Sequence, residues 1–305
     1  MSSPLERYLA ELNDLSKPLL TAKLVDLSDL FPEEAEVFLR EWPGIDAERR
    51  RQIAGRLAEL AEDNLELDFD VVFRACLDDA DGEVRAQAAG GLWGSEERSL
   101  IEPLIRLLIE DEEHAVRAAA ADALGQFALL AELGDLPEGD AHRVEEALIR
   151  AFEKGDEQLY VRCRVLEAIG PLSKPHIEEM IRQAYRSDLL ELQVSALYAM
   201  GRNCNPGWLP VILKELRSHN PQLRFEAVRA CAELEAGEAV PHLLELTRDS
   251  DPEVQLSAIG ALGQIGSSEA KEGLQECLEN PEDKIREAAQ EALEDIKFWE
   301  DPLGF

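Results

Sequence analysis

A glycine-rich stretch, DPEVQLSAIGALGQIG (251–266), is the part of the sequence that most resembles a ligand-binding loop. Its glycines could cradle a phosphate, and Asp251 with Glu253 could bind a metal ion. Dinucleotide binding requires GxGxxG and a P-loop requires GxxxxGK[ST], and the sequence contains neither. A calcium loop beginning at Asp249 would need a glycine at its sixth position, which is Val254. The stretch therefore lacks the patterns for phosphate or calcium binding.

Histidine and cysteine, which serve in transition-metal sites and nucleophilic catalysis, are few and scattered. No CxxC pair joins any of the five cysteines, and no GxSxG motif marks a serine nucleophile. We expect Cys76, Cys231 and Cys277 to be small buried side chains and Cys204 to be an exposed thiol in a link. The sequence thus favours a non-catalytic protein without a metal or another cofactor.

The composition is strongly acidic, with 64 Asp and Glu against 31 Lys and Arg and a formal charge of −33. Such a charge repels nucleic acids and anionic membranes, so neither is expected as a partner. It suits a basic partner, and it is also a common way to remain soluble. We expect a cytoplasmic protein, because the N-terminus lacks a signal-peptide pattern and no apolar run is long enough to cross a membrane.

An internal repeat explains the glycine-rich stretch. An Arg or Gln, which we call the anchor, recurs every 31 or 32 residues except for one interval of 45, at Arg85, Arg117, Arg162, Gln193, Arg224, Gln255 and Arg286. Apolar or small residues one before and three, six and seven after each anchor lie on one helix face. Six before each anchor is a short polar residue that can bond a free N–H at a turn: Asp79, Asp111, Asp156, Ser187, Ser218, Asp249 and Asn280.

A second amphipathic segment precedes each turn, as in IEPLIRLLIED (101–111) and WLPVILKELRSHN (208–220). Each unit is therefore predicted to be a helix, a tight turn and a second helix that carries the anchor. Pro252 suits the first helical position, and Asp251 and Glu253 suit the positive end of the helix dipole. Because one helix pair cannot bury its apolar face, the units must stack.

The stretches DPEVQLSAIGALGQIG and DGEVRAQAAGGLW resemble the HEAT repeat, in the short form of phycobilisome-lyase-like proteins, over about residues 67–297. The resemblance implies an all-α solenoid of the armadillo type, a right-handed α–α superhelix of about seven helix pairs. Iron-dependent deoxyhypusine hydroxylases resemble this fold and bind iron through His-Glu dipeptides, but none of the five histidines here precedes a glutamate. The repeat type says little about function, because it occurs in scaffolds, chaperone-like lyases and a few enzymes.

Three regions lie outside the regular pattern. Residues 1–66 lack the anchor and are expected to form an N-terminal helical cap, with helices over 32–42 and 46–62. Residues 298–305 are expected to form a C-terminal tail that folds back on the array. An insertion near 128–141 is expected first to lengthen a helix and then to form a loop, with Leu129, Leu130 and Leu133 in the helix and Gly134, Pro137 and Gly139 in the loop.

The predicted cap contains the only compact basic run of the chain, Arg49, Arg50 and Arg51. In so acidic a sequence, we expect these arginines to pair with nearby carboxylates on a solvated face.

The resemblance implies that the second helix of each unit lines a concave face, with positions two and five after the anchor on it. Arginine and tyrosine in this row are of the types enriched at binding hot spots. The candidate partner-binding residues are Arg164, Glu167, Tyr198, Glu226 and Arg229. We expect a non-catalytic scaffold or adaptor that binds a protein or peptide. Two alternatives stay open: a phycobilin-lyase-like protein that handles a prosthetic group, and a regulatory subunit of a larger complex.

Overall fold

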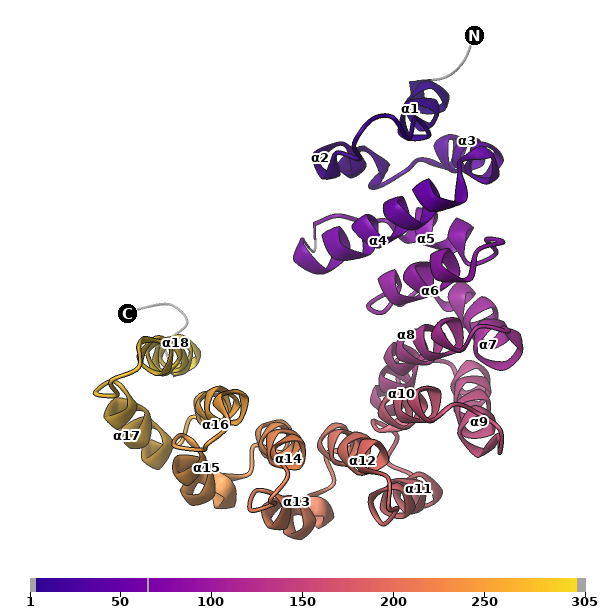
Figure 1. The fold of residues 1–305 in the computed structure, drawn as a ribbon. Coiled ribbons are helices and arrows are strands. Elements are labelled where there is room, and N and C mark those ends of the chain that lie inside the picture. Colours follow the sequence, from indigo (N-terminus) through magenta and orange to yellow (C-terminus); the bar gives the residue numbers. More distant parts are fainter. Residues whose placement is uncertain (1–3, 65, 301–305) are drawn as a thin grey trace. The chain divides into compact units, whose positions relative to one another are not determined.

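The computed structural model describes residues 4–64 and 66–300, and every regular element within these ranges is helical (Figure 1). The all-α prediction is confirmed. The chain divides into two compact units, unit 1 (Met1–Ile169) and unit 2 (Gly170–Phe305), and each is described by itself.

Unit 1 contains the first part of the helical array. Its α-helices are α1 (Pro4–Leu12), α2 (Thr21–Leu24), α3 (Pro32–Glu41), α4 (Ala47–Asp63), α5 (Asp70–Cys76), α6 (Gly82–Gly91), α7 (Ile101–Glu110), α8 (His114–Leu133), α9 (Glu138–Glu153) and α10 (Leu159–Ile169). Short 3₁₀ helices cover Val25–Leu27, Trp42–Gly44 and Arg98–Leu100.

Unit 2 continues the alternation of helices. Its α-helices are α11 (Pro175–Tyr185), α12 (Leu190–Asn203), α13 (Leu209–Glu215), α14 (Pro221–Glu233), α15 (Val240–Leu246), α16 (Pro252–Ile265), α17 (Ser268–Cys277) and α18 (Asp283–Glu300). Short 3₁₀ helices cover Pro206–Trp208 and Gly237–Ala239.

The helices of each unit form two rows (Figure 1). From α4 onward, the even-numbered helices, which we call B helices, pack side by side: α4, α6, α8 and α10 in unit 1, and α12, α14, α16 and α18 in unit 2. From α5 onward, each odd-numbered A helix packs against the B helix that follows it. The anchors lie on B helices, so the predicted order of helix, turn and anchor-bearing helix is confirmed.

The glycine-rich stretch that opened the sequence analysis is helix α16 with both of its ends. Asp251 Oδ1 accepts hydrogen bonds from the backbone N–H groups of Glu253 (2.9 Å) and Val254 (3.4 Å), which caps the N-terminus. Pro252 occupies the first turn, and Gly266, with a φ of 62°, ends the helix. The stretch is therefore a structural unit, as its repeat pattern predicted.

Small residues let neighbouring B helices approach closely. A Cβ atom on Gly201 would lie 2.9 Å from Ala230 Cα, and one on Gly263 would lie 2.8 Å from Ala292 Cβ. The columns of Ala and Leu around each anchor are buried between these helices, as in Ala258 and Leu262 of α16. Close packing of these columns forms the core of each unit.

The insertion differs in part from its prediction. Helix α8 does extend to Leu133, and Gly134, with a φ of 80°, ends it. However, α9 already begins at Glu138, so Gly139 lies in a helix, and its assignment to a loop was wrong. The acidic side chains of Glu138 and Asp140 favour a helix start at this point because they face the positive end of the dipole.

The predicted C-terminal tail is described only at its beginning. Residues 298–300 belong to α18, and the side chain of Phe298 is exposed. The remainder of the tail, 301–305, lies outside the described residues. Within the described ranges, no helix combines the length and the apolar character needed to cross a membrane.

Candidate partner-binding surface

The anchor side chain joins one repeat to the next, and Arg224 shows how. Its Nη1 donates a hydrogen bond to the carbonyl of Ser218 (2.9 Å), the turn residue of its own repeat. Its Nε and Nη2 donate to the two carboxylate oxygens of Asp249 (2.8 and 2.6 Å), the turn residue of the next repeat. Asp249 also accepts from the backbone N–H of Asp251 (2.8 Å). The turn residue was predicted only to bond a backbone N–H, and it also links two repeats.

The same bonds recur in unit 1. Arg85 donates to the Asp79 carbonyl (2.8 Å) and to both oxygens of Asp111 (2.7 and 2.9 Å). Arg117 donates to the Asp111 carbonyl (2.8 Å) and to both oxygens of Glu157 (2.9 and 2.6 Å). Paired, fork-shaped arginine–carboxylate contacts of this kind fix both distance and orientation.

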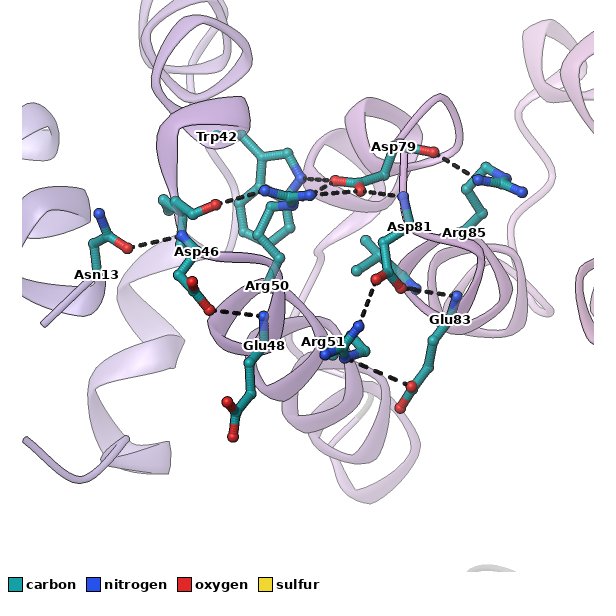
Figure 2. A network of polar contacts seen from close by, with 12 residues as sticks. Asn13, Trp42, Asp46, Glu48, Arg50, Arg51, Asp79, Asp81, Glu83 and Arg85 are labelled. Atoms are coloured by element: carbon teal, nitrogen blue, oxygen red, sulfur yellow. Dashed lines mark hydrogen bonds and ion pairs between the residues drawn. The ribbon is translucent and has the colours of Figure 1, made fainter. Parts of the chain in front are cut away.

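A further joint lies in the region predicted to be a cap (Figure 2). Arg50 of α4 contacts Asp79 through Nε (2.9 Å) and Nη2 (3.1 Å), and Trp42 Nε1 also donates to Asp79 (2.7 Å). Arg50 therefore acts as an anchor, although the sequence pattern had not assigned one within 1–66. Two departures from the pattern concealed this anchor. Arg50 lies 35 residues before Arg85, and the position before it holds Arg49, where the other repeats carry an apolar residue. The residues three and seven positions after Arg50, Ile53 and Leu57, are buried as in the other repeats. These two apolar positions could have revealed the anchor in the sequence.

The basic run does not lie on one solvated face as expected. Arg51 behaves as predicted and pairs with Asp81 (2.5 Å) and Glu83 (3.7 Å) (Figure 2). Arg50 forms the predicted carboxylate pair, but it is buried. Arg49 is buried as well, and its hydrogen bonds go to backbone carbonyls. The expectation was wrong for these two because α4 turns them toward α6 and toward the segment after α1.

Three of the joint acids, Asp111, Glu157 and Asp249, remain charged at neutral pH. Burial raises the pKa of Asp111, Glu157 and Asp249, but hydrogen bonds from their arginines and from backbone N–H groups outweigh it. Each pKa therefore lies below its usual value. These joints are true ion pairs.

Two predicted binding residues, Arg164 and Glu167, lie together on α10 of unit 1. Arg164 Nη2 is 2.7 Å from Glu167 Oε1, and the guanidinium lies 5.8 Å from the ring centroid of the exposed Tyr160. Asp122 on α8 faces the same group. Partial desolvation by the surrounding helices raises the pKa of Asp122 to about 7 although the residue keeps contact with solvent, with Arg164 lowering the pKa and Glu167 raising it further.

The other three predicted residues meet in unit 2. The guanidinium of Arg229 on α14 lies 5.2 Å from the ring centroid of Tyr198 on α12. The same group lies 5.9 Å from the Phe225 ring and 3.4 Å from Glu226. Each unit thus carries a cluster of arginine, aromatic ring and carboxylate on its B helices. Whether these clusters line a concave face stays a prediction.

A groove of about 750 Å³ opens between α16 and α18 on the B helices of unit 2. Small residues and three carboxylates line most of it: Glu235, Leu256, Gly260, Gly263, Gln264, Ala288, Glu291, Ala292 and Asp295. The hot-spot criterion overlooked this groove because it searches for large side chains. The available signal was Gly260, five residues after its anchor, where the first repeat also carries a glycine, Gly90, and the other five carry Asp, Glu, Tyr or Arg.

The comparison with protein families decides the classification. The family model described as HEAT repeats matches residues 70–148 and 209–294, more than half of the chain. The chain belongs to the HEAT repeat family. No curated protein matches it.

Solved structures with a similar arrangement include other helical-repeat proteins. YibA of Escherichia coli is 18% identical, with 78% of this chain and 96% of that chain covered and a TM-score of 0.46. The CpcE–CpcF complex of phycocyanin lyase from Nostoc is 19% identical, with 74% and 94% covered and a TM-score of 0.47. Human deoxyhypusine hydroxylase is 17% identical, with 96% and 97% covered and a TM-score of 0.37. Similarity at this level carries no argument about function.

Within 4–64 and 66–300, no group of three or more His, Cys, Asp or Glu side chains could hold a metal ion. Cys76 and Cys231 are buried as predicted, whereas Cys277 is only half-buried. Cys204 is the predicted exposed thiol. Burial, with Glu233 nearby, raises its pKa, which is opposite to the activation of a nucleophile.

Proposed function

We propose that this HEAT repeat protein is a non-catalytic scaffold that binds a basic segment of a protein partner on the B helices of unit 2. The groove between α16 and α18 carries this proposal. Glu235, Glu291 and Asp295 border it, all three are exposed, and none forms an ion pair with another described residue. Unpaired carboxylates along a groove attract Lys and Arg side chains.

The floor of the groove allows a backbone to approach the helices. A Cβ atom on Gly260 would meet no atom within 4 Å, so the helix surface is open at this point. Leu256, which is 37% exposed, supplies an apolar contact beside it. An extended segment with basic and apolar side chains matches this combination of a flat floor and charged borders.

The cluster of Tyr198, Phe225 and Arg229 lies further along the same row of helices. Aromatic and arginine side chains are the types that contribute most at interfaces. The cluster therefore supports a second contact for the same partner. The net charge of −33 adds a long-range attraction that salt will weaken.

A groove-filling substitution tests the proposal. The probe is a fluorescein-labelled dodecapeptide of alternating Arg and Leu, followed by fluorescence anisotropy at low salt. We expect Gly260→Leu to weaken binding about tenfold or more, because one blocked contact of this size amounts to about 1.4 kcal/mol. Gly90→Leu is the matched control, because Gly90 lies on B helix α6 and a Cβ there also meets nothing.

Two outcomes would count against the proposal. Equal binding by the wild type and Gly260→Leu would exclude the groove, and binding that does not weaken with salt would exclude a basic partner. Affinity capture from the native host with both forms then identifies the partner as the protein lost with Gly260→Leu. An absorbance shift on incubation with a bilin would instead favour the prosthetic-group alternative.

A further inference from the structure

A small pocket in unit 1 lies apart from the groove proposed above. It has a volume of about 170 Å³ and is formed by α1, the segment after it, α2 and the beginning of α4. Apolar side chains and a tyrosine make up half of its lining: Tyr8, Leu12, Pro18, Leu19 and Leu20. The remainder is charged: Glu11, Asp14, Lys17, Lys23 and Arg49.

Arg49 is the unusual member of this pocket. The residue is only 3% exposed. Nη2 donates to the carbonyls of Asp14 (3.0 Å) and Lys17 (2.8 Å), and the buried Nε has no hydrogen-bond partner. No described carboxylate lies within ion-pair distance of this guanidinium. A buried charge is costly unless an opposite charge compensates it, and backbone carbonyls supply none.

The other charges of the pocket cancel one another. Lys23 Nζ lies 2.9 Å from Glu11 Oε1, and Lys17 Nζ lies 3.3 Å from Asp14 Oδ2. Arg49 is thus the one unbalanced charge among the pocket residues. It stands in the first turn of the 17-residue helix α4, where the helix dipole is positive and disfavours a cation. Both observations indicate that one negative charge is missing from this pocket.

We propose that the pocket binds a small apolar monocarboxylate, whose carboxylate pairs with Arg49. A planar carboxylate matches the donors of a guanidinium, and the helix N-terminus stabilises it further. A dianion such as phosphate is disfavoured because Glu11 and Asp14 border the pocket. The leucines and Pro18 fit an apolar body, and the volume equals that of roughly six water molecules.

The experiment compares isovalerate with its uncharged isostere, isovaleramide, on the full-length protein. The arginine Nε–Hε signals are followed by NMR, and the Arg49 signal is assigned from its loss in Arg49→Lys. We expect this signal to shift with isovalerate until it saturates and to remain unchanged with isovaleramide. A signal that does not move with isovalerate, or moves equally with the amide, would overturn the proposal.

Variants separate binding from folding. Arg49→Gln, which lacks the followed signal and is therefore titrated by calorimetry beside the wild type, is expected to bind isovalerate at least tenfold more weakly, since a hydrogen bond to a charged group is lost. Because Arg49 also holds the segment after α1, Leu19→Trp provides an independent variant that fills the pocket and retains the arginine. We expect it to abolish the shift as well. Arg56→Gln, on the exposed side of α4, is the matched control and should bind isovalerate as the wild type does. Wild-type affinity in Leu19→Trp would also overturn the proposal.

Discussion

Unit 1 and unit 2 hold their repeats together in different ways. In unit 1, three successive joints are buried or partly buried ion pairs: Arg50–Asp79, Arg85–Asp111 and Arg117–Glu157. In unit 2, the anchors alternate between glutamine and arginine, and the corresponding pair among its described residues is Arg224–Asp249. Gln193 reaches only the Ser187 carbonyl of its own turn (2.8 Å).

Where the ion pair is missing, unit 2 keeps close contacts between small residues, and unit 1 has such a contact too, between Gly125 and Ala168. Gly201 approaches Ala230 between α12 and α14, and Gly263 approaches Ala292 between α16 and α18. An ion pair with two hydrogen bonds restricts both distance and direction, whereas apolar contact is non-directional. We therefore expect unit 1 to keep a fixed repeat geometry and unit 2, which carries the groove, to adjust to a partner.

The largest effect is expected from breaking one joint of unit 1. Arg117→Ala removes the buried partner of Glu157, whose side chain is 1% exposed, and leaves only the more exposed Lys154 (3.3 Å) as an ion-pair partner. This should lower the free energy of unfolding by about 3–5 kcal/mol. The equivalent change in unit 2, Gln193→Ala, removes one neutral hydrogen bond and should cost about 1 kcal/mol. Urea unfolding combined with hydrogen exchange resolved by unit measures both. Equal effects of the two variants would contradict the comparison.

The next effect concerns the small-residue contacts of unit 2. Gly201→Ala places a methyl group 2.9 Å from the backbone of Ala230, and overpacking should cost about 1–3 kcal/mol. Gly260→Ala, on the same row but in open space, should instead stabilise α16 by up to about 1 kcal/mol. In a thermal unfolding experiment, the first variant should therefore have a lower melting temperature than the wild type and the second a higher one. A stabilised Gly201→Ala would show that α12 and α14 do not need this close approach.

Acid should distinguish the charged joints from the uncharged ones. The pKa values of Asp111, Glu157 and Asp249 are lowered in the folded state. Their stabilisation is therefore complete above the usual carboxylate pKa, about 4, and is lost as the pH falls through the lower folded values. Hydrogen exchange at decreasing pH should show that the joint of α14 and α16 weakens before that of α12 and α14. Simultaneous weakening of the two joints would count against this assignment.

The smallest effect is expected at Asp122 of unit 1, whose pKa is raised to about 7. A raised pKa means that the charged form is disfavoured in the folded state, so stability decreases as the pH rises from about 4 to 7. Asp122→Asn should raise the melting temperature at pH 8 and leave it unchanged at pH 3. The gain should be modest because the side chain also touches solvent. A gain of equal size at both pH values would indicate a cause other than charge.

Most of the fold could be predicted because equivalent positions in each repeat have the same structural role and therefore carry similar residues. A short acid such as Asp251 caps a helix, and alanines such as Ala258 and Ala261 are needed wherever two helices touch. Residues that serve one location only could not be predicted this way. The burial of Arg49 depends on the segment after α1, which has no counterpart elsewhere in the chain.

The candidate site was predicted less completely for a related reason. Arg229 and Tyr198 were found because they are of the residue types enriched at binding hot spots and stand in a row of mostly polar side chains. The groove at Gly260 depends on the absence of a side chain at that position and on three carboxylates, two from α18 and one from the link after α14. Such a site emerges only when neighbouring repeats are stacked, and no single repeat contains it.

The joint between repeats also makes the array extendable. Every linking acid belongs to one repeat and its arginine to the previous one. A repeat with both groups can therefore pair with a neighbour at each end. Arg286 of α18 is the last anchor, and among the described residues no later turn supplies an acid for it. Its carboxylate contact is Asp283 of its own helix. A copy of 221–251 inserted between existing repeats of unit 2 should therefore lengthen the protein without a new interface. A raised urea midpoint would show that the inserted repeat engages, and a lowered one that it does not.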